Sequence, residues 1–181
     1  MKVRTFAGSA VLIALAATGP AKAAMGILDE AKLGLLAHDL PIGADRREQG
    51  VDTNLELLFT SPALLAPVWA PRPDIGINVN SSGGNSYAYA GLTWEANFTD
   101  QFFGDLGLGG AVHDGPDLTA QTTRDRKGLG TRALFHESVA LGYRVSANWN
   151  GSAYLDHVSN AGLGRHNPGI TNLGMRLGYK F

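Results

Sequence analysis

The chain has 181 residues, of which 24 are glycine, none is cysteine and 17% are charged. The absence of cysteine excludes disulfides and thiolate metal sites, and the formal net charge of −1 argues against a nucleic-acid partner. The length suits a single domain, and the glycine-rich composition favours strands and tight turns over helices.

The first residues have the features of an export signal. Lys2 and Arg4 precede an apolar run from Thr5 to Thr18, and Ala21-Lys22-Ala23 fits the A-x-A cleavage site of a signal peptide. The run is well short of the ~20 residues that a membrane-spanning helix needs, which argues against an anchor. We therefore predict a signal peptide over residues 1–23, cleavage near Ala23, and one mature domain over residues 24–181.

Apolar and polar residues alternate along almost the whole mature chain, which is the period expected of strands. Eight strands are the smallest common size of an outer-membrane barrel. We predict an all-β fold, an eight-stranded antiparallel transmembrane β-barrel of the outer-membrane type. The expected strands lie near Lys32–His38, Val51–Phe59, Asp74–Asn80, Tyr87–Phe98, Phe102–Val112, Arg132–Val145, Trp149–Ala161 and Asn172–Phe181.

The alternative is a soluble β-sandwich, because its strands show the same alternation. Three features favour the barrel. The segments approach the ~9–11 residues of a tilted spanning strand, and aromatic residues gather at strand ends, where interfacial girdles lie. The chain also stops at Tyr179-Lys180-Phe181, which resembles the terminal signal that the barrel-assembly machinery recognises.

A barrel of eight strands has an interior filled by side chains, so no pore is expected. Charged residues on the polar faces of the strands would then pair inside it. They are Asp52, Glu56, Glu95, Asp105, Arg132, Arg144, Asp156, Arg176 and Lys180.

If both termini are periplasmic, the connections fall into two groups. Short ones near Thr99–Gln101 and Ser146–Asn148 face the periplasm, together with an irregular flap, Ser61–Pro73, that contains four prolines. The external connections are Asp39–Gly50, Asn80–Asn85, His113–Gly130 and Asn160–Pro168.

Six basic residues fall on these external connections. The outer leaflet presents phosphorylated glycolipid, and lysine and arginine suit phosphate groups, so we expect phosphate contacts there. The alternative is ordinary loop polarity, because Asp45, Glu48 and Asp125 lie beside them. The six are Arg46, Arg47, Arg124, Arg126, Lys127 and Arg165.

His157 and Ser159 share the apolar face of their strand with Leu155, Ala153 and Trp149. In a barrel this face is turned to lipid, where polar groups are costly. The strand rise puts the two Cα atoms about 6–7 Å apart, which the side chains can bridge. A hydroxyl beside an imidazole suits a serine hydrolase, although a lone pair of this kind in a strand is more often structural.

The residues after this pair carry a family resemblance. The segments His157-Val158-Ser159-Asn160-Ala161-Gly162-Leu163 and Asn167-Pro168-Gly169-Ile170 resemble the C-terminal signature of PagL-type lipid A 3-O-deacylases, the acyloxyacyl-hydrolase-like barrels. The likeness runs from about Gly130 to Phe181. It implies removal of an ester-linked acyl chain from lipid A without a metal or cofactor. It also implies Ser159 as nucleophile, His157 as general base, and Asn160, Gly162 and Asn167 near the oxyanion.

One position departs from the family pattern. The family places a glutamate two residues after the glycine that Gly169 matches, and here that position is Thr171. A threonine accepts a hydrogen bond from imidazole but cannot stabilise imidazolium as a carboxylate does. Glu137, on the preceding strand, is predicted to lie roughly opposite His157 and is a candidate substitute acid. The alternative places Glu137 near the interface, or turned away by a bulge.

The sequence therefore predicts an outer-membrane lipid A deacylase, whose partners are lipopolysaccharide and the surrounding membrane lipid. The rival hypothesis is a non-catalytic small barrel, either a structural or adhesion protein or a family member that is inactive because it lacks the acid.

Overall fold

The computed structural model describes residues 27–41, 48–116, 126–164 and 166–181. A 3-10 helix, η2 (Ala63–Val68), lies between the second and third of eight strands. Within these residues no helix is long and apolar enough to cross a membrane. The strands are β1 (Leu28–Ala37), β2 (Val51–Phe59), β3 (Arg72–Asn80), β4 (Tyr87–Asn97), β5 (Phe102–His113), β6 (Ala133–Arg144), β7 (Trp149–Ser159) and β8 (Ile170–Lys180).

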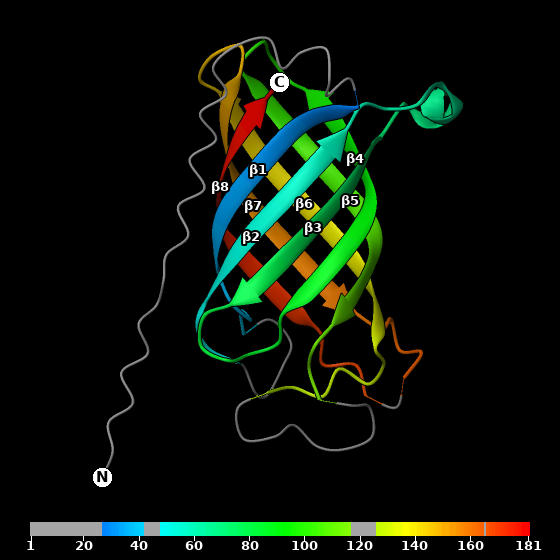
Figure 1. Ribbon diagram of the computed structural model, residues 1–181, viewed down its shortest axis with the longest axis vertical. Coiled ribbons are helices and arrows are strands. Elements are labelled where there is room, and N and C mark those ends of the chain that lie inside the picture. The colour runs from blue at the N-terminus through cyan, green and yellow to red at the C-terminus, as the bar shows by residue number, and fades with distance from the viewer. Residues whose placement is uncertain (1–26, 42–47, 117–125, 165) are drawn as a thin grey trace.

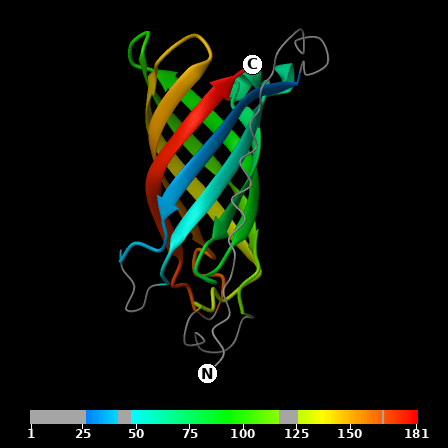
Figure 2. The same ribbon diagram turned by 60° about the vertical axis from the view of Figure 1, so that its left-hand side comes forward.

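Each strand pairs antiparallel with its neighbour in the chain, and β1 also pairs with β8, so the sheet closes into a barrel. Figures 1 and 2 show the tilted strands of this wall from two sides. We call the upper end in Figure 1 the turn end; it holds the connections Thr99–Gln101 and Ser146–Asn148 and the C-terminus. The opposite end, with the longer connections, is the loop end.

The side chains are arranged inside out relative to a soluble protein. Leu33, Leu141 and Met175 point outward and are 57%, 64% and 64% exposed, whereas Asn54 and Asp156 inside the barrel are 0% exposed. A soluble sandwich would bury the first set, so the apolar outer wall excludes it and fits a bilayer. The predicted outer-membrane-type barrel is confirmed.

Ion pairs fill the interior. Lys32 Nζ lies 2.6 Å from Asp105 Oδ2. Arg176 Nη1 lies 3.0 Å from Glu56 Oε1, and the guanidinium carbon sits 3.5 Å from the centroid of the Tyr154 ring. Such pairing allows charges to be buried at the core of so narrow a barrel.

Seven of the nine charged residues expected inside follow this pattern. Asp52, Glu56, Asp105, Asp156 and Arg176 are buried, and Arg144 pairs with Glu95 at 2.6 Å near the turn end. The prediction is wrong for two. Lys180 ends β8 at the rim, where its side chain is 45% exposed and 3.9 Å from Asp29. Arg132 precedes β6 and donates to the carbonyls of His113 and Gly115. Strand parity does not extend to residues at or beyond strand ends.

Several strand boundaries also differ from the predicted ones, among them β7, which ends at Ser159, and β8, which begins at Ile170; two of the differences are explained by single residues. β1 begins four residues before Lys32, because Glu30 and Lys32 face inward as ion-paired residues and interrupt the apolar pattern. β3 begins at Arg72, so Pro73 belongs to the strand rather than to the preceding connection. Proline is tolerated there because it stands at the beginning of the strand.

Candidate active site

A row of three polar side chains crosses the outer wall near the loop end. Strand pairing places Glu137 of β6 opposite His157 of β7, and His157 opposite Thr171 of β8. One step closer to the loop end, Ser159 lies opposite Phe135. The register expected for Glu137 and Thr171 is therefore confirmed, and the row interrupts an otherwise apolar surface.

A hydrogen bond of 2.8 Å joins Nδ1 of His157 to Oγ1 of Thr171. It leaves Nε2, the nitrogen that a general base uses in a serine triad, on the far side of the ring. Thr171 thus bonds to the imidazole from the position where an acid was expected, and it adds no negative charge.

Gly169 packs against the same imidazole. A Cβ atom built there would lie 2.7 Å from Cε1 and 3.1 Å from Nε2 of His157, and the residue has a left-handed φ of 59°. Both the space and the backbone conformation require glycine. The ring is held between a hydroxyl on one side and bare backbone on the other.

Ser159 is the last residue of β7 and is 9% exposed. Within the described part of the chain its hydroxyl makes no hydrogen bond to His157 or to another group. The two side chains share the outward face two residues apart, which keeps them within reach of one another. In free enzymes such bonds are often long and shorten only when substrate is bound.

Asn160, 2% exposed, shapes the connection that follows Ser159. Its Nδ2 donates to the carbonyls of Leu129 and His166, at 2.8 and 2.6 Å. Its Oδ1 accepts from the N–H of Gly162, and its own N–H donates to Oδ1 of Asn167, both at 2.9 Å. Asn160, Gly162 and Asn167, which were expected near the oxyanion, are thus brought together. The N–H groups of Asn160 and Gly162, however, already donate to side chains of this set and to nearby carbonyls.

Glu137 has an exposed side chain on the outer wall. Among the described residues no hydrogen bond or ion pair reaches its carboxylate. It faces the backbone position of His157 across β6 and β7 without bonding to the ring. A carboxylate therefore lies in the row, but the hydrogen bond to the His157 imidazole comes from Thr171.

Of the six basic residues predicted to meet phosphate, Arg46, Arg47, Arg124 and Arg165 lie outside the described residues. Arg126 pairs with Asp114. Lys127 is only 2% exposed, and its ammonium donates to Asp39 at 2.6 Å and to the carbonyl of Gly169 at 3.2 Å. In this arrangement Lys127 is turned away from an external ligand.

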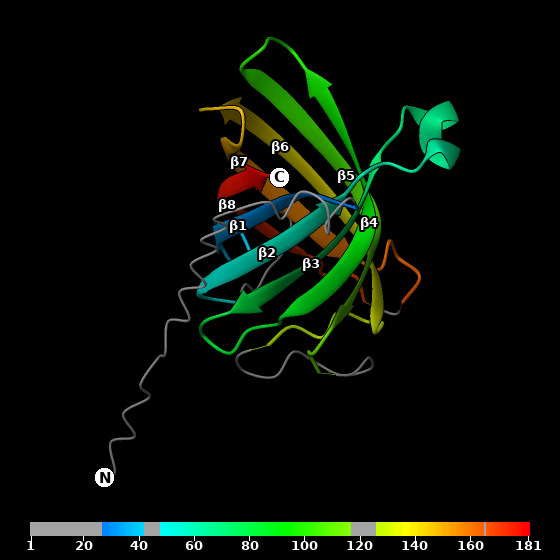
Figure 3. The same cartoon turned by 45° about the horizontal axis from the view of Figure 1, so that its top comes forward.

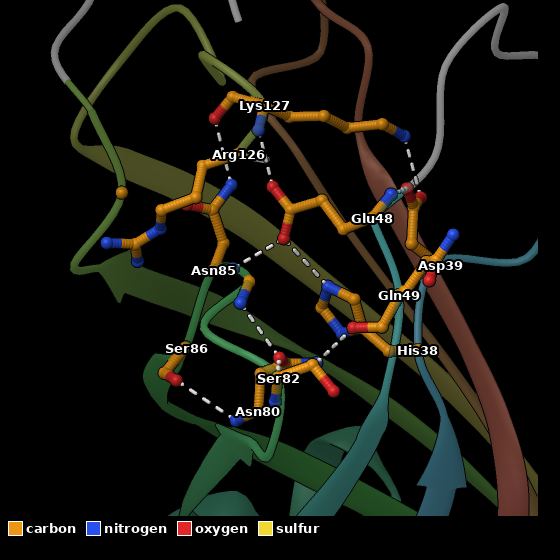
Figure 4. A network of polar contacts seen from close by, with 12 residues as sticks. His38, Asp39, Glu48, Gln49, Asn80, Ser82, Asn85, Ser86, Arg126 and Lys127 are labelled. Carbon is orange, nitrogen blue, oxygen red and sulfur yellow. Dashed lines mark hydrogen bonds and ion pairs between the residues drawn. The ribbon is translucent and has the colours of Figure 1, made fainter. Parts of the chain in front are cut away.

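A polar cluster at the loop end, which we call the clamp, was not foreseen from the sequence (Figure 4). His38 lies 2.8 Å from Asp52 and 2.9 Å from Glu48. Glu48 also accepts the backbone N–H groups of Asn85 and Lys127. The clamp comprises His38, Asp39, Glu48, Asp52, Asn85 and Lys127, and through Lys127 it reaches Gly169, the residue that packs on His157.

The clamp holds a charged histidine. Burial disfavours the imidazolium, but hydrogen bonds to Asp52 and Glu48 and their negative charges outweigh this and raise the pKa of His38 to about 9. Burial likewise disfavours the Glu48 carboxylate, yet its bonds to His38, Lys127 and Asn85 lower its pKa. Sequence spacing gives no signal for this cluster, because its members come from several different connections.

No group of three or more histidine, aspartate or glutamate side chains in the described ranges is arranged to hold a metal ion.

The solved structures that match the chain include two with the same fold. The "outer membrane enzyme PagL" crystal structure matches with a TM-score of 0.60 and 20% identity, over 82% of this chain and 97% of that one. A structure from "de novo design of transmembrane beta-barrels" matches with a TM-score of 0.54 and 13% identity, over 86% and 96%. Among curated protein sequences none matches the chain.

The sequence itself gives the more specific result. The family model described as "Lipid A 3-O-deacylase (PagL)" matches residues 65–180, which is more than half of the chain and includes the whole polar row on the outer wall. The chain therefore belongs to the lipid A 3-O-deacylase (PagL) family.

Proposed function

We propose that the protein is an outer-membrane enzyme that hydrolyses an ester-linked acyl chain of lipid A, at the 3-O position, through Ser159 and His157. The observation that carries the proposal is the His157–Thr171 hydrogen bond on the lipid-facing wall, two residues from Ser159. A substrate embedded in the bilayer could reach this face from the side, without entering the filled barrel.

In the proposed reaction, the Oγ atom of Ser159 attacks the ester carbonyl while Nε2 of His157 takes the hydroxyl proton. The tetrahedral intermediate collapses to an acyl-serine, and the imidazolium returns the proton to the departing sugar hydroxyl. Water then attacks the acyl-serine and gives a proton to His157. The fatty acid leaves as serine regains its proton.

In this proposal Thr171 and Glu137 each take one role of the glutamate that the family pattern places at position 171. The N–H at Nδ1 of His157 donates to Thr171, which orients the ring. Glu137, one strand away in the same row, supplies the negative charge that favours the transient imidazolium. The separation of the two tasks predicts a slower enzyme than one with a single glutamate at position 171.

The connection from Asn160 to Asn167 is the candidate oxyanion site, because it begins directly after the proposed nucleophile. Its donors, among them the N–H of Gly162, are internally satisfied in the free protein, so substrate entry would have to release one of them. The external arginines Arg46, Arg47, Arg124, Arg126 and Arg165 remain candidates for the phosphate groups of the substrate.

Two steps precede activity in this proposal. Residues 1–23 direct export and are removed near Ala23. The barrel-assembly machinery then recognises the last strand with Phe181, whose N–H donates to the carbonyl of Asp29 at 3.0 Å and so ties the chain end to β1.

Mass spectrometry of lipid A tests the function. Cells that produce the protein should lose one hydroxyacyl chain from lipid A, and cells that produce Ser159→Ala at equal barrel levels should not. An unchanged lipid A profile with the unmodified protein would instead favour a non-catalytic barrel, the second candidate, which the threonine at position 171 supports.

A further inference from the structure

We propose that the part of the predicted flap that precedes β3, Ser61–Pro71, is a membrane anchor that inserts into the headgroup–acyl boundary of the leaflet at the turn end; from here on this part is called the flap. Its partner is a phospholipid surface. The proposal concerns the attachment of the barrel to the bilayer and stands apart from catalysis.

The composition of the flap suits lipid better than water. Ser-Pro-Ala-Leu-Leu-Ala-Pro-Val-Trp-Ala-Pro has no charged residue. Leu64 and Trp69 are 86% and 88% exposed, which makes them more exposed than the barrel residues Leu33 and Met175 that face the membrane. A tryptophan beside leucine and valine is the combination found where proteins meet the membrane interface.

The backbone holds Trp69 in this exposed position at a cost. Trp69 and Ala70 are consecutive non-glycine residues with left-handed φ values of 65° and 48°. Backbone strain of this kind persists only where the surrounding structure imposes it, and it is enriched at functional sites. Two internal bonds impose it here, from the N–H of Trp69 to the carbonyl of Ala66 and from the N–H of Ala70 to that of Leu65, at 3.2 and 3.0 Å.

The flap is attached to the lipid-facing side of the barrel. The indole N–H of Trp94, on the outer face of β4, donates to the carbonyl of Val68 at 2.8 Å. Figures 1 and 3 show η2 standing out sideways from the wall at the turn end rather than lying across the barrel mouth. The exposed apolar side chains therefore continue the surface that the bilayer already covers.

Trp69 of the flap joins the aromatic residues that surround the turn end. Phe102 and Tyr143 stack edge to face on β5 and β6, and Trp149 and Tyr179 do so on β7 and β8. The strands β1 and β3 contain no aromatic residue. Trp69, carried by the connection between β2 and β3, adds to Phe59 at the end of β2 and Trp94 on β4 on that side.

A single nitroxide label can locate the flap, because the chain has no native cysteine. The full-length mature barrel is reconstituted in phosphatidylcholine vesicles with the label at Leu64→Cys, at Leu33→Cys on the mid-barrel wall, or at Ala147→Cys in a polar turn of the same barrel end. Collisions with oxygen, which concentrates in lipid, are compared with collisions with a water-soluble nickel chelate. We expect the label at position 64 to prefer oxygen, as at 33, and the label at 147 to prefer the chelate.

Two results would overturn the proposal. A label at position 64 that behaves like the one at 147 would place the flap in water. A label shielded from both reagents, with spin–spin broadening, would place it against a second copy of the chain. Since the flap is uncharged, the oxygen preference should also persist in anionic phosphatidylglycerol vesicles and at high salt.

The indole of Trp69 provides a second, label-free measurement. Bromine atoms on the phospholipid acyl chains quench nearby tryptophans, and Trp69→Phe should remove a large part of the quenchable emission. The tether is tested by Trp94→Phe in the Leu64→Cys background, which should reduce the oxygen preference. An unchanged preference would refute the part of the proposal that assigns anchoring to the Trp94 bond.

Discussion

Two histidines near the loop end show how differently one side chain can be used. His38, behind the wall, lies between two carboxylates that keep it charged, with a pKa of about 9. Among the described residues, His157 on the outer wall has one hydrogen-bond partner, the uncharged Thr171, and its other ring nitrogen makes no hydrogen bond. A histidine fixed as a cation at neutral pH can stabilise the fold through ion pairs, whereas a general base must accept and release a proton. The first histidine is therefore suited to stability, whereas the second is the proposed general base.

The largest difference between the two histidines is expected in deacylation activity, for the variant His157→Gln. Glutamine retains hydrogen-bonding capacity but cannot take the proton of Ser159, and loss of one triad member typically lowers turnover by roughly 10³-fold or more. Deacylation should fall to the level of Ser159→Ala. The heat-dependent shift of the folded barrel on SDS gels should be unchanged in both variants; if activity survives in His157→Gln, this residue is not the base.

For the clamp the expected effect is on stability. Glu48→Gln removes a charge that His38 and two backbone N–H groups share, and breaking a buried ion pair by removing one partner costs roughly 3–5 kcal/mol. The midpoint of unfolding in urea, measured in lipid vesicles, should fall, while turnover per folded barrel should stay within a few-fold. Turnover that collapses with the fold intact would mean that the clamp acts directly on the active site.

A substitution at position 171 sharpens the comparison, because a glutamate there would give His157 a carboxylate partner like those of His38. Thr171→Glu should raise the rate, because a carboxylate both orients the ring and stabilises imidazolium. Thr171→Val should lower it by up to about tenfold, which corresponds to the loss of roughly 1.4 kcal/mol, near the upper end for one hydrogen bond. Initial rates on purified lipid A distinguish the two directions. A glutamate variant no faster than the native protein would mean that the charge is already supplied.

Glu137→Gln tests where that charge comes from. We expect a reduction of a few-fold, smaller than that of Thr171→Val, because Glu137 acts at a distance and makes no bond to the ring. Ser159→Ala, assayed alongside, defines complete loss. If Glu137→Gln is as active as the native protein while Ser159→Ala is inactive, the substitute-acid hypothesis is wrong.

The outer wall was more predictable from the sequence than the interior. Alternation determines which residues face lipid, so eight strands, the register of Glu137 opposite His157 and the placement of Thr171 all follow from counting residues. The clamp did not follow, because Glu48 and Lys127 meet only when separate connections fold over one end of the barrel. The start of β1 was missed because inward ion pairs such as Lys32–Asp105 resemble loop polarity until their partner strand is known.

The last expected effect is a dependence of barrel stability on pH, which tests the ionic state of His38. Its pKa is raised from the ordinary 6.5 to about 9, so the folded protein holds the proton more tightly than the unfolded chain. The stabilisation is therefore complete below pH 6.5 and is lost as the pH rises through about 9. The urea midpoint should decrease across this interval, and His38→Gln should flatten the curve over the same range. A midpoint that falls equally in both proteins would show that His38 is not held as a cation, and its contrast with His157 would then disappear.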